Sequence, residues 1–197
     1  GALVSNAGAY RENICEILID LEVVERGELK RVTPDWMGFS YRDSKLRREG
    51  RGHSVLISAR LKLVKKGRQE VLKKARENQR QRIFKQPWNP SAGSFFKNVN
   101  DYELAQKIPG LTDGMRANGV VPSGMLTSLA NCKGLKCGGA EISNRHGNFV
   151  INRDEATATD IYNLTRTVKK RVFDTFGVTL EEEVLFLGDW SKTMPTS

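Results

Sequence analysis

A serine in a short glycine-serine-phenylalanine run is the first candidate for chemistry. Ser94 follows Gly93 and precedes the apolar pair Phe95 and Phe96. Glycine lets a backbone come close to a ligand, and an apolar run indicates a place from which water is largely excluded. A hydroxyl there can exchange a proton with a bound molecule. An ordinary loop that enters a buried strand is the competing interpretation, and the serine alone does not decide between the two.

An arginine among aromatic residues is the second candidate. Arg42 lies beside Phe39 and Tyr41 and is followed by Asp43. A guanidinium donates two parallel hydrogen bonds to a carboxylate and stays protonated, so this pattern favours a carboxylate-binding arginine in a dry pocket. The alternative is a surface Arg42 that pairs with Asp43 or Glu49.

Three consecutive carboxylates near the C-terminal end are the third candidate. Glu181, Glu182 and Glu183 stand directly before an apolar run. Side chains alternate across a strand, so one of the three can point inward while the others are solvated.

The cysteines and histidines do not show the spacing of a metal site. Cys15, Cys132 and Cys137 are an odd number, and the chain has only two histidines. We interpret the cysteines as reduced packing thiols of a cytoplasmic protein, and we expect no bound metal. A lone histidine such as His146 is more often structural than a ligand contact.

The charge balance is basic, with a formal net charge of +9. Basic residues concentrate between Lys62 and Lys85, where Glu70 and Glu77 are the acids. Such a run can bind phosphates, form the solvated face of a helix, or attract anionic small molecules. The aromatic interleaving typical of single-strand binders is missing, so nucleic acid is not the expected partner. No apolar run is long enough to cross a bilayer, and no signal peptide opens the chain, so we expect a cytoplasmic protein without a membrane partner.

In the first half of the chain, hydrophobic residues recur with two periods, one typical of strands and one typical of a helix. Alternation predicts strands over residues 15–24, 29–32 and 53–64, and Thr33-Pro34 begins a short helix. A helical period over residues 67–82 leaves a thin apolar stripe of Val71, Leu72 and Ala75. Prolines after this helix predict a domain boundary near Phe84.

The second half reads as a mixture of strands and one long helix. Residues 148–152 predict a buried strand, Thr157 to Gly177 a helix opened by a capping box, and residues 180–188 a closing strand. Residues 99–121 are rich in turn residues apart from a short helix at 103–107, and they predict a surface excursion.

Six segments, in order along the chain, resemble the UDP-N-acetylenolpyruvoylglucosamine reductase family. The segments are Asn6–Tyr10, Phe39–Ser44, Gly93–Asn98, Lys133–Ser143, Asn148–Asn152 and Leu180–Val184. The resemblance implies an α+β fold. It makes residues 1–84 the second half of an FAD-binding domain of the PCMH type, without the N-terminal FAD-binding subdomain, and residues 85–197 a substrate-binding C-terminal domain.

The resemblance also implies an activity. Family members use FAD and NADPH to reduce the enolpyruvyl group of UDP-N-acetylglucosamine-enolpyruvate to UDP-N-acetylmuramate, a step of peptidoglycan precursor synthesis. The runner-up is a truncated, non-catalytic module that binds a UDP-sugar or nucleic acid.

Site residues follow from the resemblance by motif position. The cofactor loop would be Asn6, Ala7, Gly8, Ala9 and Tyr10. The catalytic residues would be Arg42 on the substrate carboxylate, Ser94 as proton donor and Glu183 as orienting carboxylate. The substrate-binding residues would be Tyr41, Lys85, Asn98 and His146, although Lys85 also reads as one more member of the basic run.

Two departures from the family pattern stand out. Family members usually pass quickly from the asparagine at position 98 to the helix start that Pro122 marks here, whereas this chain inserts residues 99–121. Thr127 and Ser128 stand where relatives often carry an acidic residue, which removes support for a ligand contact there.

Overall fold

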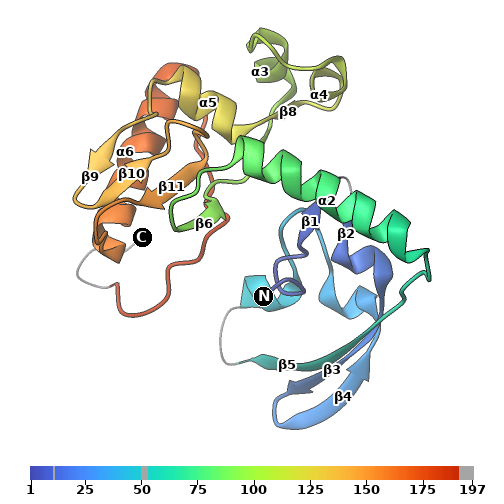
Figure 1. Cartoon of the computed structure of the whole chain (residues 1–197). Helices are drawn as coiled ribbons and strands as arrows, with labels where there is room; N and C mark the ends of the chain where they lie inside the picture. The colour runs from blue at the N-terminus through green and yellow to red at the C-terminus, as the bar shows by residue number, and fades with distance from the viewer. Residues whose placement is uncertain (11, 50–52, 191–197) are drawn as a thin grey trace. The chain divides into compact units, whose positions relative to one another are not determined.

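The computed structural model describes residues 1–10, 12–49 and 53–190 (Figure 1). The chain divides into two compact units, Gly1–Val71 and Leu72–Ser197, and each is described by itself below. Both units combine strands with helical segments, which confirms the expected α+β class.

The first unit is built on a three-stranded antiparallel sheet in the order β4-β3-β5. Its elements are β1 (Gly8–Ala9), β2 (Glu12–Asn13), η1 (Ile14–Ile17), β3 (Leu18–Glu25), β4 (Glu28–Val32), η2 (Pro34–Met37), α1 (Lys45–Glu49) and β5 (Ser54–Leu61). Arg26 and Gly27 join β3 to β4 with φ angles of 53° and 83°. Positive φ at both turn residues matches the right-handed twist of a hairpin.

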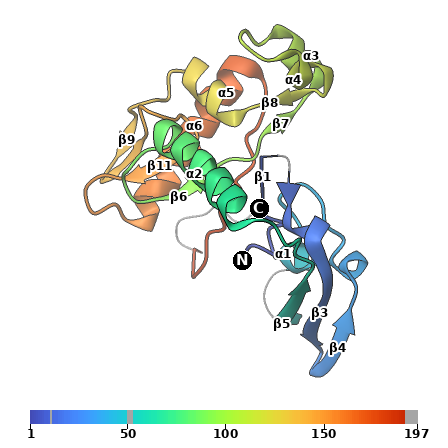
Figure 2. The same ribbon diagram turned by 45° about the vertical axis from the view of Figure 1, so that its right-hand side comes forward.

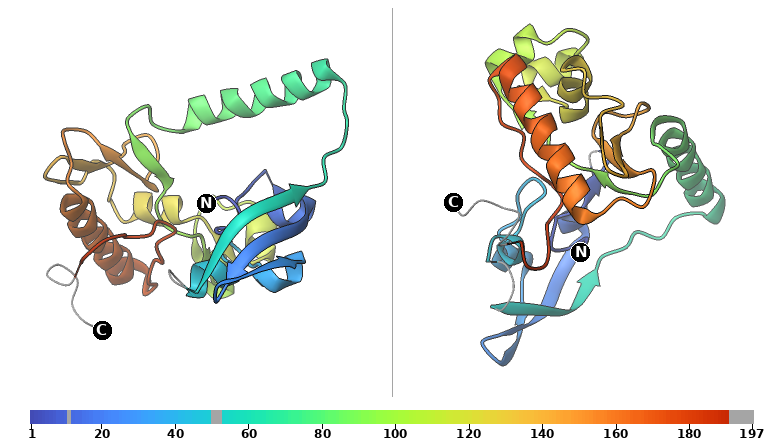
Figure 3. Two further views of the ribbon diagram at one scale, coloured as in Figure 1. Left: turned by 90° about the horizontal axis from the view of Figure 1, so that it is seen from below. Right: turned by 90° about the vertical axis from the view of Figure 1, so that its left-hand side faces the viewer.

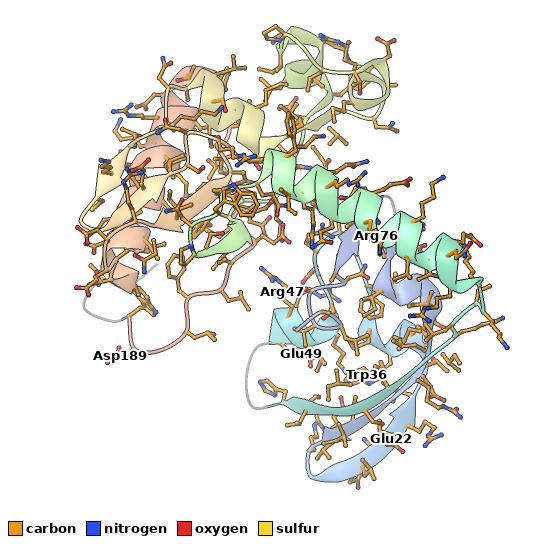
Figure 4. The ribbon with its side chains drawn as sticks, in the orientation of Figure 1. Glu22, Trp36, Arg47, Glu49, Arg76 and Asp189 are labelled. Atoms are coloured by element: carbon orange, nitrogen blue, oxygen red, sulfur yellow. The ribbon has the colours of Figure 1, made fainter. Side chains whose placement is uncertain are left out.

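One face of this sheet carries the core of the first unit. Leu21, Val23 and Met37 are fully buried and pack with Leu18 and Leu46. The opposite face is charged, as Glu22 shows in Figure 4, where Arg31 donates to it over 2.6 Å. Trp36, labelled in the same figure, lies on η2 with the Lys45 ammonium 4.0 Å from its ring centre.

The strand expected over residues 15–24 begins later than predicted. Residues 14–17 form the 3-10 turn η1 because Asn13 and Glu16 make a capping box, in which the Glu16 carboxylate accepts from the Asn13 backbone N–H over 3.0 Å. This local bond competes with strand pairing, so β3 starts only at Leu18.

The helix expected after the first sheet is present as α2 (Arg68–Lys85), but its apolar stripe is not buried. None of the α2 residues, all of which the structure describes, is buried. Val71 and Leu72 are 49% and 42% exposed. Basic side chains such as Arg76 project from the helix (Figure 4). Helicity here depends on local propensity, because the sequence offers too few apolar residues for an amphipathic face.

The second unit is organised around an antiparallel sheet in the order β6-β11-β10-β9. Its strands are β6 (Ser91–Ser94), β9 (Lys136–Cys137), β10 (Ala140–Ile142) and β11 (Phe149–Asn152). The helix α6 (Ala158–Phe176) packs against β9 and β10, and the shorter helix α5 (Ser123–Leu129) packs against α6 (Figure 3). The predicted helix ends are confirmed: Thr157 and Asp160 form the capping box, and Gly177 closes α6 with a φ of 72°.

The inserted residues 99–121 fold into the second unit instead of forming the expected surface excursion. They form β7 (Val99–Asn100), α3 (Tyr102–Lys107), α4 (Asp113–Ala117) and β8 (Val120–Val121), which lie together in Figure 2. Their buried apolar side chains join the core of the second unit and are Leu104, Ala105, Ile108, Leu111 and Val121. Burial of these side chains outweighs the turn-rich composition that suggested a loop.

The closing strand predicted over residues 180–188 is wrong. Pairing is limited to residues 181–183: Glu182 forms an isolated bridge with Phe96, the Lys97 N–H donates to the Glu181 C=O, and the Glu183 N–H donates to the Phe95 C=O. The chain after Glu183 is irregular. Aromatic packing holds this segment, because Phe186 lies 5.5 Å from Tyr162 and 5.1 Å from Trp190 between ring centres. The apolar run therefore reflects ring packing instead of strand pairing.

Candidate active site

Ser94 is the last residue of β6, where the sheet edge turns into the core. It pairs with Phe149 of β11, and Gly93 before it takes a left-handed φ of 83°. The Ser94 residue is exposed, whereas Phe95 and Phe96 are 2% and 1% exposed. Exclusion of water, which the sequence suggested at Ser94, therefore begins one residue later.

Asn148 binds the chain directly after Ser94. Its side-chain Oδ1 accepts from the Phe96 N–H over 2.9 Å, and its Nδ2 donates to the Phe96 C=O over 2.9 Å. The Asn148 backbone C=O also accepts from the Phe95 N–H over 2.8 Å. Three hydrogen bonds from one residue thus fix the two peptides that follow the candidate hydroxyl.

The carboxylate segment lies along the other side of the same chain. The Glu183 N–H donates to the Phe95 C=O over 2.8 Å, so the segments that carry Ser94 and Glu183 are directly joined. Glu181 forms an ion pair with Lys97, and Glu182 accepts from Lys169 over 2.9 Å. Glu181 and Glu182 therefore have cationic partners on this unit, and Glu183 is half-buried beside the Ser94 segment.

Asn98 ends the segment at the start of α5. Its Oδ1 accepts from the Ser123 N–H over 3.4 Å, and the buried Ser123 hydroxyl donates to the Phe96 C=O over 3.1 Å. Asn98 is therefore already engaged in holding the beginning of α5.

His146 lies on the loop before β11 and packs edge-on against Phe149, with 4.9 Å between ring centres. Its Nδ1 accepts from the Asn148 N–H over 3.2 Å, so the proton of the neutral ring is on Nε2. Burial lowers the pKa of His146, and the positive charges of Lys133 and Lys85 lower it further. Gly124 of α5 lies so close that a Cβ there would stand 2.9 Å from the His146 ring.

Arg145, which sequence reasoning missed, connects this loop to the end of α2. Its guanidinium donates to the carbonyls of Ile83 and Phe84 over 2.8 and 2.7 Å and lies 5.9 Å from the ring centre of Trp88. A cation on the last carbonyls of a helix is a favourable C-terminal cap. It fixes the helix end that carries Lys85.

In the first unit, the structure brings the predicted cofactor loop and Arg42 together. Arg42 Nη2 donates to the Gly8 C=O over 2.6 Å, and its guanidinium lies 5.4 Å from the Tyr41 ring centre. The buried Asn6 side chain donates to the Ser40 C=O over 3.0 Å. Two hydrogen bonds therefore tie the cofactor loop to the turn that carries Arg42.

Three of the six non-glycine residues with positive φ in the described part of the chain lie at the same place. Asn6, Tyr10 and Arg42 have φ angles of 44°, 54° and 55°, a left-handed conformation that side chains other than glycine rarely adopt. Strained backbone of this kind clusters at ligand-binding sites, where the surrounding contacts hold it.

The loop fits the flavin that the family resemblance implies. A Cβ at Gly8 would lie 2.2 Å from Asn13 Oδ1, so the loop stays this tight only with glycine. Ala9 and Tyr10 are exposed at its tip and can meet a planar ring. The candidate residues therefore form two groups, Asn6–Tyr10 with Tyr41 and Arg42, and Lys85 with Ser94, Asn98, His146 and Glu183. Convergence of the two groups on one pocket stays a prediction.

The part of the chain that the structure describes contains neither a cluster of metal ligands nor a disulfide. No three His, Cys, Asp or Glu side chains come together there as metal ligands. Cys15, Cys132 and Cys137 are free, and burial raises the pKa of the Cys132 thiol, which lowers its reactivity.

An apolar pocket of about 330 Å³ lies beside the Ser94 segment. It opens between Ser91 and Ala92 of β6 and the irregular residues 184–187, with Trp190 at its wall. A separate cavity of about 600 Å³ lies between the inserted helix α3 and the end of α6. Among residues 1–10, 12–49 and 53–190, no helix is both long and apolar enough to span a membrane.

A family comparison matches the second unit. The model of the UDP-N-acetylenolpyruvoylglucosamine reductase C-terminal domain covers residues 85–187. This range contains Ser94, Glu183 and the other predicted site residues of the second unit.

Comparison with individual proteins extends the match over almost the whole chain. The chain is 34% identical to the UDP-N-acetylenolpyruvoylglucosamine reductase of Bacillus pumilus over 96% of its own length and 56% of the relative's. The Agathobacter rectalis reductase is 36% identical, over 96% of this chain and 54% of that protein. The crystal structure of UDP-N-acetylenolpyruvylglucosamine reductase from Thermus caldophilus superposes with a TM-score of 0.70 at 32% identity, over 93% of this chain and 57% of that one. The chain thus spans a little more than half the length of these relatives.

Proposed function

The chain belongs to the UDP-N-acetylenolpyruvoylglucosamine reductase family, and from that premise we propose that the protein containing it reduces UDP-N-acetylglucosamine-enolpyruvate to UDP-N-acetylmuramate. NADPH is the reductant and FAD the cofactor of this proposal, and peptidoglycan precursor synthesis in the cytoplasm is its setting. The observation that carries it is the direct bond between the Ser94 and Glu183 segments at Phe95.

Residues Asn6–Tyr10 would hold the flavin. When bound, FAD would supply the hydride chemistry that connects NADPH with the enolpyruvyl group. The exposed Ala9 and Tyr10 would face the ring, while the buried Asn6 keeps the loop closed.

Arg42 would bind the substrate carboxylate, on which negative charge develops during reduction. Its hydrogen bond to the Gly8 C=O and its position over Tyr41 fix the guanidinium before substrate arrives. Donors that are fixed in advance stabilise developing charge by several kcal/mol, about 3 kcal/mol for one well-placed group.

Ser94 would deliver the proton to the carbon beside the carboxylate. A serine hydroxyl is a weak acid, but the acceptor carbon is strongly basic at that moment, so position matters more than pKa. Glu183, held next to it through Phe95, would orient the substrate carboxylate or Arg42.

The remaining candidates would bind the UDP part of the substrate. Lys85 brings positive charge near His146, whose neutral ring offers its Nε2–H as a donor. Tyr41 and Asn98 complete the proposed set. The same proposal assigns residues 1–84 to the flavin-binding part and residues 85–197 to the substrate-binding part.

The test is an anaerobic absorbance experiment on the natural full-length protein that contains this chain. We expect a yellow flavoprotein whose visible absorbance is bleached by NADPH and restored by UDP-N-acetylglucosamine-enolpyruvate. A reduced flavin that the enolpyruvyl substrate does not reoxidise would overturn the proposal. A colourless protein that still binds UDP-N-acetylglucosamine would support the non-catalytic module instead.

A further inference from the structure

Asn148 makes a paired contact with the backbone beside the proposed proton donor. It is 5% exposed and lies 52 positions away in sequence from Phe96, whose N–H and C=O it engages simultaneously. Both distances are 2.9 Å. A side-chain amide offers a donor and an acceptor in one plane without carrying a charge.

The same residue is connected to three of the proposed site groups. Its backbone C=O accepts from the Phe95 N–H, one residue after Ser94, and its own N–H donates to the His146 ring. The Phe95 C=O in turn accepts from the Glu183 N–H. Asn148 thus fixes the peptide from which both Ser94 and Glu183 take their positions.

Backbone contacts along β6 do not replace this side chain. The pairing of β6 with β11 is irregular between Phe149 and Ile151, so the strand register alone leaves the end of β6 less constrained. Ser123 also donates to the Phe96 C=O, but it offers no acceptor for the Phe96 N–H.

We propose that Asn148 is a positioning residue, which sets the location of the Ser94 hydroxyl for proton delivery and, through Phe95, that of Glu183. This inference rests on the proposed function. It predicts that Asn148 acts in the reduction of the enolpyruvyl substrate and not in the reduction of the flavin by NADPH.

The first test is Asn148→Asp in the natural full-length flavoprotein. Above neutral pH the new carboxylate still accepts from the Phe96 N–H but repels the Phe96 C=O. We expect the reoxidation of reduced flavin by UDP-N-acetylglucosamine-enolpyruvate to slow roughly 100-fold, since small displacements of a reacting group cost that much. Flavin reduction by NADPH should stay within about twofold of the unmodified protein, because it does not use the Ser94 hydroxyl.

The pH dependence of Asn148→Asp distinguishes a lost hydrogen bond to Phe96 from a general disruption of the fold. A protonated carboxyl has one donor and one acceptor, like the amide it replaces. Burial raises the pKa of the new carboxyl above its ordinary value, so the variant regains this proton as the assay pH is lowered, here from about 8 to about 6. The slow half-reaction of Asn148→Asp should recover over that range, whereas Asn148→Leu, which has neither group, should not recover.

Controls keep folding and function apart. Asn152→Asp is the matched control, because Asn152 is the last residue of β11, the strand that directly follows Asn148, and its side-chain oxygen accepts from the Ala156 N–H, away from Ser94. Amide hydrogen exchange without cofactor or substrate gives an independent readout: Asn148→Leu should accelerate exchange at Phe96, while Asn152→Asp should not.

The outcomes distinguish two failures. If Ser94→Ala slows the enolpyruvyl half-reaction and both Asn148 variants leave it unchanged, the positioning role is overturned and the proposed function stands. If the unmodified protein does not reduce the enolpyruvyl substrate, the proposed function fails first. Equal slowing of both half-reactions by Asn148→Asp, without recovery at lower pH, would also overturn the inference.

Discussion

Ser94 and Arg42 are held by different contacts, and each contact determines what a substitution should do. Ser94 takes its place from the backbone bonds of its neighbours Phe95 and Phe96. Arg42 is fixed through its own guanidinium, which donates to the Gly8 C=O. Loss of the Ser94 hydroxyl should therefore leave the fold intact, whereas a change at Arg42 also releases the cofactor loop.

Ser94→Ala tests the proton donor. We expect flavin reduction by NADPH to stay nearly normal and reduction of the enolpyruvyl substrate to fall by about 10² to 10⁴, the usual contribution of a positioned acid. Stopped-flow absorbance of the flavin measures both steps. Ser91→Ala, at the other end of β6, is the matched control. Equal effects on both steps would remove Ser94 from proton transfer.

Arg42→Lys tests whether the planar guanidinium of Arg42 binds the substrate carboxylate. A lysine ammonium cannot donate two parallel hydrogen bonds to a carboxylate, so we expect turnover to fall about 100-fold although the charge is kept. Steady-state kinetics with the enolpyruvyl substrate measure this loss. Arg31→Lys is the control: Arg31 lies on β4 and forms an ion pair with Glu22 of β3, so this change should leave turnover unchanged. Near-normal turnover of Arg42→Lys would contradict the carboxylate-binding role.

His146 should make the second unit sensitive to acid. Its pKa is lowered in the folded state from 6.5, so the unfolded chain binds the proton more readily than the folded one. Stability contributed by the neutral ring is therefore present above about pH 6.5 and decreases as the pH falls below that value. Thermal unfolding at several pH values measures the effect.

His146→Gln should flatten this pH dependence, because glutamine does not titrate. His53→Gln, at the other histidine and in the other unit, is the matched control for the loss of an imidazole. An unaltered acid sensitivity in His146→Gln would show that another group is responsible.

The sequence supplied candidates for part of the proposed site. Ser94, Arg42 and Glu183 were singled out because the short segments around them resemble the family motifs, and their roles stay predictions. Asn148 and Arg145 were not singled out, because their importance comes from contacts across 52 and 61 positions, which local spacing does not reveal. The available signal for Asn148 was its side-chain amide directly before the buried strand, where an amide can bind neighbouring backbone.

Elements with strong local signals formed as the sequence predicts. The capping box at Thr157 and the glycine at 177 define α6, since both act through bonds within one turn. The insertion and the closing segment depend on distant partners, and there local patterns failed. Residues 184–187 look like a strand in sequence, but they pack through rings instead of pairing.

The inserted helix α3 should contribute to stability as a core element. Leu104 is 8% exposed within the core of the second unit, so Leu104→Ala should lower the free energy of unfolding by about 2 to 4 kcal/mol. Tyr102→Ala, on the same helix at a position that is 63% exposed, should cost about 0.5 kcal/mol or less. Urea denaturation measures both. Equal small effects would show that the insertion is a peripheral excursion after all.

For the whole molecule, six ordered segments carried more information than any single motif. The resemblance of these segments implied the α+β class, and the composition showed a basic net charge. The family comparison matches residues 85–187, and the relatives match almost the whole chain. Because the chain spans a little more than half of each relative, the complete reaction is proposed for the natural full-length protein. The basic net charge of +9 is consistent with anionic ligands of the kind that this reaction uses.

The most direct measurement is the stoichiometry of the reaction under anaerobic conditions. The natural full-length protein, loaded with FAD, is mixed with NADPH and UDP-N-acetylglucosamine-enolpyruvate, and the product is identified by mass spectrometry. We predict one UDP-N-acetylmuramate formed for each NADPH consumed. NADPH consumption only when oxygen is admitted, with the enolpyruvyl compound recovered unchanged, would contradict the reductase assignment.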